Sequence, residues 1–142
     1  MAASTAVSAE EFRMVRHQAL SQYQQVNTAA VVEGASPHKL IQMLMQGCLQ
    51  RIAEGKGALQ RGDMAAKGLA IGKAINIVAG LQSSLNKEVA SPLPQQLDDL
   101  YDYMQRRLLE ANLKSSEAAL DEVADLMRKI KEGWDGIEAK AV

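Results

Sequence analysis

Apolar residues recur at intervals of three and four through most of the chain after residue 35, which is the spacing of one face of an α-helix. Ser36-Pro37 marks a helix start, because the hydroxyl can cap the helix and proline needs no N–H at the first position. No alternating strand pattern lasts six residues, so we predict an all-α protein. The helices are expected over residues 36–61, 63–86 and 94–113, with a last helix that begins after Ser115 or Ser116 and ends near residue 137.

The connections between these helices predict how they are arranged. The links that follow Arg61 and Leu113 are very short, and short links force neighbouring helices to run antiparallel. The connection over residues 87–93 is longer, and its prolines prevent helix continuation. We therefore expect residues 36–142 to form an antiparallel up-and-down four-helix bundle. Residues 1–35 are expected to form a partly disordered N-terminal arm with a short helix.

The predicted helices differ in how much of their circumference is apolar. The large apolar residues of the last helix fall within roughly 100–120°, which is one buried face. Those of the first long helix sweep through roughly 240°, which is more than one side of a bundle helix can bury. In the next helix, Leu69 and Ile77 point away from the core stripe. A strip of small residues, together with Asn76, lies between them and that stripe. Apolar surface should therefore remain after the bundle closes, and such a patch marks a partner site.

The predicted partner-binding groove consists of outward residues of these two helices: Ile41, Met45, Cys48, Leu49, Ile52, Leu69, Gly72, Asn76 and Ile77. The arm could cover this groove with its own thin apolar face: Phe12, Val15, Tyr23 and Val26. The sequence patterns are compatible with two uses of this groove. It could be covered permanently, by the arm or by a second copy in a homodimer, or it could bind an exchangeable partner. Tyr103 and Asn112 are two further candidate contacts, although Tyr103 could equally be a boundary residue and Asn112 could simply help to end its helix.

Composition narrows the class of function. Sixteen basic and seventeen acidic residues give a formal charge of −1, with no basic stripe, so nucleic acid is not an expected partner. Cys48 is the only cysteine and the only histidines are His17 and His38, so no catalytic, metal or cofactor motif is present. No signal peptide and no long uninterrupted apolar run is found, so we expect a soluble cytoplasmic protein without membrane insertion.

Three segments in order resemble one known family. They are Ala35-Ser36-Pro37-His38-Lys39-Leu40-Ile41, Gly62-Asp63-Met64-Ala65-Ala66-Lys67-Gly68, and the helix that runs from Leu100 to Leu113. The sequence is similar in these segments to the flagellar export chaperones of the FliS family, and Tyr23 and Val26 match the arm that covers the binding surface in that family. Met45-Gln46-Gly47-Cys48 departs from an aromatic-Asp-Gly-Ala pattern common there.

The resemblance implies a non-enzymatic chaperone that binds the C-terminal segment of flagellin in the cytosol. It further implies that the protein keeps flagellin from polymerising early and delivers it to the flagellar type III export apparatus, with a component of the export gate as a second partner. Two other functions are compatible with the same bundle: an interaction module of another kind, such as an anti-sigma-type protein or a general secretion chaperone, and a cofactor enzyme of the bundle class.

Overall fold

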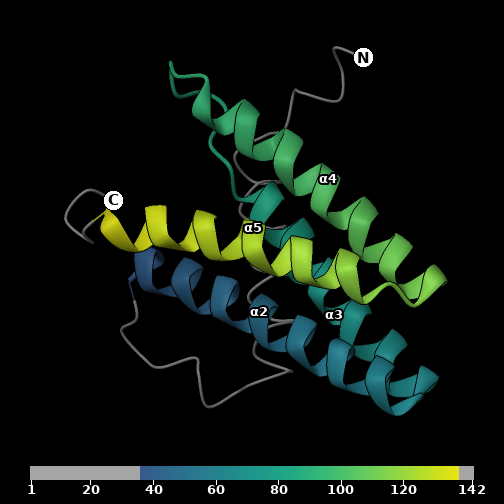
Figure 1. Ribbon diagram of the computed structural model, residues 1–142. Helices are drawn as coiled ribbons and strands as arrows, with labels where there is room; N and C mark the ends of the chain where they lie inside the picture. The colour runs from purple at the N-terminus through teal and green to yellow at the C-terminus, as the bar shows by residue number, and fades with distance from the viewer. Residues whose placement is uncertain (1–35, 138–142) are drawn as a thin grey trace.

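The computed structural model describes residues 36–137, and this range consists of helices and links without a strand. The helices are α2 (Pro37–Arg61), α3 (Met64–Ser83), α4 (Leu93–Lys114) and α5 (Glu117–Gly136), as Figure 1 shows. The prediction of an all-α helical bundle is confirmed. The predicted arm and its residues Phe12, Val15, Tyr23 and Val26 lie outside the described residues, so the division into an arm and a bundle domain stays a prediction.

The helix ends follow the capping residues that the sequence offers. The Ser36 hydroxyl accepts a hydrogen bond from the Lys39 amide at 3.1 Å, and Asp63 and Ser116 cap α3 and α5 in the same way. Gly62 ends α2 with a φ of 76°, a conformation that favours glycine. Helix α3 ends at Ser83, two or three residues earlier than predicted. The Ser84 hydroxyl donates to the Leu81 carbonyl at 2.8 Å at this helix end.

The four helices form a square in which each helix contacts its two neighbours. Helices α2 and α4 both pack against α3 and against α5, and consecutive helices run antiparallel (Figure 1). The short links over residues 62–63 and 115–116 lie at one end of the bundle, and the longer link over residues 84–92 lies at the other. The predicted up-and-down order is therefore present.

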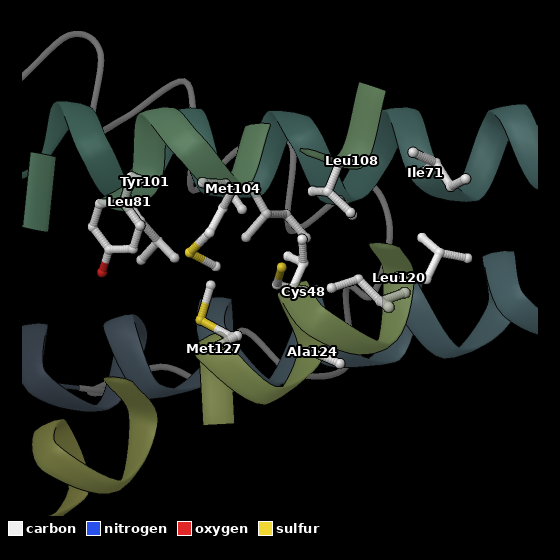
Figure 2. Close-up of a cluster of buried hydrophobic side chains, with 14 of the residues drawn as sticks. Cys48, Ile71, Leu81, Tyr101, Met104, Leu108, Leu120, Ala124 and Met127 are labelled. Carbon is white, nitrogen blue, oxygen red and sulfur yellow. The ribbon is translucent and has the colours of Figure 1, made fainter. Parts of the chain in front are cut away.

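The core lies along the axis of this square and takes side chains from all four helices. Met104 of α4 and Met127 of α5 point toward one another, with Cys48 of α2 beside them (Figure 2). The fully buried thiol of Cys48 has its pKa raised to about 12 by desolvation, so it stays protonated at neutral pH. Tyr101 is buried in the same cluster, as its place in the apolar stripe predicts.

Helix α3 is the one helix among residues 36–137 that is long and apolar enough to cross a bilayer by length and composition. Its apolar residues Ile71, Ala74, Val78 and Leu81 are buried in the bundle core. The apolar composition of α3 is therefore accounted for in part by the side of the helix that forms the bundle core.

Polar side chains join the helices around the core. The indole N–H of Trp134 donates to the His38 carbonyl at 3.0 Å, and the two rings stack with their centroids 4.7 Å apart. This contact attaches the end of α5 to the beginning of α2. Further along the same pair of helices, the Lys56 ammonium forms an ion pair with Asp121 at 2.7 Å. Both contacts lie between α2 and α5, away from the outer side of α3.

Candidate partner-binding surface

Four residues of the predicted groove are buried in the core: Met45, Cys48, Ile52 and Ile77. The prediction that they face outward is wrong, because α2 buries a wider arc than a single-face count allows. It packs against α3 on one side and α5 on the other. At Gly55, α2 and α3 come so close that a Cβ added to this glycine would lie 3.0 Å from Ile71 Cγ1.

Two more residues of the predicted groove, Ile41 and Leu49, are half-buried and pack against the core. Leu49 also lines a shallow depression between α2 and α5. The rest of that lining is mostly polar or charged: Gln46, Gln50, Ala53, Asp125, Arg128, Lys129, Lys131, Glu132 and Asp135. The α2 part of the prediction therefore does not form a continuous apolar surface with the α3 part.

The other three predicted residues lie on the outer side of α3. The Leu69 side chain is 63% exposed, and Asn76 is exposed two turns further along. A Cβ added at Gly72 would meet nothing within 4 Å, so the helix surface is open there. No residue of α3 is acidic. This face of the helix therefore carries no negative charge. It carries one basic residue, Lys73, one turn beyond Leu69, and small residues line it as the strip predicts.

Helix α4 extends this surface with two leucines that the sequence-based prediction did not include. Leu109 is 51% exposed and Leu113 is 75% exposed. Both lie off the core stripe of the helix, and this is the signal in the sequence that could have identified them. Met64, at the beginning of α3, is 51% exposed and its sulfur lies 3.9 Å from the Ser115 hydroxyl oxygen.

Contacts between α3 and α4 place these residues side by side. A Cβ at Gly68 would lie 3.8 Å from the Asn112 side-chain oxygen. Leu69 and Leu113, which follow these two residues in α3 and α4, therefore lie at about the same height along the bundle axis. Gly72 and Leu109 lie about one turn further in the same direction, because the two helices are antiparallel. We call this set the α3–α4 surface: Leu69, Gly72, Leu109 and Leu113. Met64 is not part of it, because it lies seven residues before the buried Ile71 and so on the core side of α3.

The two additional candidates have contacts within the bundle. The Tyr103 hydroxyl donates to Glu122 at 2.5 Å, so Tyr103 is a boundary residue between α4 and α5. The carbonyl of Asn112 accepts a hydrogen bond from the Lys67 ammonium at 2.9 Å near the end of α4. Asn112 therefore contributes to the helix terminus and also borders the α3–α4 surface.

Ionised groups around α4 pair with one another. Arg107 bonds Glu110 and Glu122, both at 2.7 Å. The hydrogen bond from Arg107 is the largest cause that lowers the pKa of Glu110, and the Tyr103 hydroxyl is the largest cause that lowers the pKa of Glu122. Within residues 36–137 no three His, Cys, Asp or Glu side chains gather in a way that could hold a metal ion. The surface offers burial of apolar groups rather than acid–base chemistry.

Comparison with known proteins identifies the family. Residues 19–141 match the family described as flagellar protein FliS. The chain is 48% identical to the flagellar secretion chaperone FliSB of Pseudomonas aeruginosa over 87% of its own length and 98% of that protein. It is 43% identical to the flagellar secretion chaperone FliS of Salmonella typhimurium over 84% of its length and 89% of the relative. A more distant relative, FliS of Bacillus subtilis, is 36% identical over 72% of this chain and 76% of the relative. The chain therefore belongs to the FliS family, a family of flagellar secretion chaperones and not of enzymes.

Proposed function

We propose that this protein binds the C-terminal segment of flagellin in the cytoplasm, keeps it from polymerising and delivers it to the export gate of the flagellum. The observation that supports this proposal most directly is the α3–α4 surface, where three leucine side chains are half or more exposed on adjacent helices. A surface of this kind is suited to the apolar face of a segment that is unfolded when free and becomes ordered on binding.

The size of the expected contribution follows from exposure. Complete burial of a leucine side chain is worth about 1.5 to 3 kcal/mol. Leu69 is 63% exposed in the free protein, so its burial under a ligand would contribute about 1 to 2 kcal/mol. An aspartate at this position would also place a carboxylate under an apolar ligand. We therefore expect Leu69→Asp to weaken flagellin binding about tenfold or more.

The experiment is calorimetric titration of the full chain with a peptide of the flagellin C-terminal segment. Leu69→Asp is preferred to a change at Ile41, because Ile41 also packs against the core. Leu93→Asp is the matched control: Leu93 is 53% exposed and begins α4, at the end of the bundle opposite Leu69. Its substitution makes the same chemical change away from the surface, and we expect it to leave the affinity unchanged.

The outcomes separate the alternatives. Absence of binding to the wild-type protein at micromolar concentrations would reject the proposed function. Equal losses for Leu69→Asp and Leu93→Asp would mean that the α3–α4 surface is not the binding site. If the free protein sediments as a dimer that only Leu69→Asp dissociates, and the peptide does not compete, then this surface serves self-association instead.

A further inference from the structure

Lys67 is a buried cation whose role the proposed function does not yet include. Its side chain is on α3, and the residue is only 5% exposed. The ammonium donates to the Asn112 carbonyl at 2.9 Å and to the Ser115 hydroxyl at 2.7 Å. In the part of the chain that the structure describes, it makes no ion pair with a carboxylate within 4.0 Å. Two uncharged oxygens thus hold this charge below the surface.

Both acceptors belong to the end of α4. The last four carbonyls of a helix lack partners within the helix, and a cation near them also complements the helix dipole. Ser115 follows the last helical residue with a φ of 49°, in the left-handed region where glycine would cost less. A serine in this conformation supplies the hydroxyl that accepts from Lys67. The ammonium therefore fastens the final turn of α4 to the first turn of α3.

The position of this contact relates it to the α3–α4 surface. Lys67 lies two residues before Leu69 in the sequence, and Asn112 lies directly before Leu113. A buried apolar side chain could fill the same space without the cost of desolvating a charge. It would leave the end of α4 without a donor from α3, and the exposed leucines of α4 would then be held only by packing.

We propose that Lys67 is a positioning residue for ligand binding, which holds Leu109 and Leu113 at the level of Leu69 so that one continuous surface faces the ligand. This inference rests on the proposed function, since it concerns the same surface. Lys67 itself is buried and does not contact the ligand. It acts through the last turn of α4, which would otherwise have to become ordered when the ligand binds.

The test compares Lys67→Met and Lys67→Arg with the control Lys56→Met, by titration with the flagellin C-terminal peptide. Lys56 pairs with Asp121 across α2 and α5, away from this surface. All variants are studied where urea titration shows them to be folded. We expect Lys67→Met to weaken affinity about tenfold, because the last turn must then be ordered on binding. Lys67→Arg should restore most of the affinity, and Lys56→Met should not change it.

A merely structural role would lower the urea midpoint without changing the affinity of the folded protein. Wild-type affinity in folded Lys67→Met would therefore overturn the inference. If Lys67→Met does not fold, Ser115→Ala replaces it: this variant keeps the lysine and removes only the hydroxyl acceptor. We expect it to weaken affinity about threefold, and unchanged affinity would again overturn the inference.

A second measurement does not depend on the ligand. Amide hydrogen exchange of residues 110–115 in the free protein reports how firmly the end of α4 is held. We expect exchange there to accelerate about tenfold in Lys67→Met, with the last turn of α5 unchanged. If the wild-type protein does not bind the peptide, the proposed function fails and this measurement decides the inference. Unchanged exchange at residues 110–115 would then overturn it.

Discussion

Replacing Gly72 by alanine should stabilise the free protein and weaken ligand binding at the same time. Gly72 lies in the interior of α3, where alanine is favoured over glycine by about 1 kcal/mol. The new methyl group meets no atom within 4 Å, so no clash reduces this gain. In a helical domain of this size, the change should raise the melting temperature by about 4 °C. Affinity for the flagellin peptide should fall, because the methyl group occupies space that a closely docked backbone would need.

Two other glycines provide the controls. Gly133 in α5 also has open space around it, so Gly133→Ala should stabilise the protein without changing affinity. Gly55 faces α3, where a Cβ would lie 3.0 Å from Ile71 Cγ1. Gly55→Ala should therefore lose the gain in helix propensity to overpacking, which costs about 1 to 3 kcal/mol. Urea titration and differential scanning calorimetry measure the stabilities, and calorimetric titration measures the affinities.

The comparison can refute the reasoning in two ways. If Gly55→Ala stabilises the protein as much as Gly72→Ala does, the assignment of buried and open faces of α3 is wrong. If Gly72→Ala and Gly133→Ala have the same effect on affinity, the outer face of α3 does not contact the ligand. The opposite signs expected for stability and binding at Gly72 cannot arise from partial unfolding, which would lower both.

Two further predictions concern groups with shifted pKa values. Cys48 is fully buried and burial raises the pKa of its thiol to about 12, so we expect Ellman's reagent to label it only at the rate of unfolding; rapid labelling in the native state would show that this part of the core is open. The pKa of Glu122 is lowered from 4.5, first by the Tyr103 hydroxyl and then by Arg107, so its contribution to stability is present above pH 4.5 and is lost as the pH falls through the lowered value. Tyr103→Phe should reduce stability at pH 7 and have a smaller effect at pH 3, as urea midpoints at the two pH values would show; an equal effect at both would contradict this assignment.

Much of the fold could be predicted from the sequence because its signals are local. Ser36, Gly62, Asp63 and Ser116 specify helix ends through hydrogen bonds to neighbouring backbone groups, and these ends are where they were predicted. The end of α3 was predicted two or three residues too late, because serine side chains can bond to carbonyls of the preceding turn. The periodicity alone does not show that competition.

The candidate surface was predicted less well, since it depends on how closely helices approach. Met45 and Ile52 were assigned to an outer face because the apolar arc of α2 is too wide for one neighbour. In the square arrangement α2 has two neighbours, and both flanks are buried. Leu109 and Leu113 were not predicted because they lie off the core stripe of an otherwise amphipathic helix, where a single leucine is also common on an ordinary protein surface. Leu69 and Gly72 were placed on the outer side of α3, where they lie, although their role in binding remains a prediction.

Both short links, residues 62–63 and 115–116, lie at the end of the bundle that carries the α3–α4 surface. The caps at these links fix the ends of α3 and α4 in the free protein, so we expect the protein itself to lose little conformational entropy when a ligand binds. Differences in affinity among ligand peptides should then follow the free energy needed to fold each peptide. A ligand peptide with higher intrinsic helix propensity would bind more tightly without making any new contact.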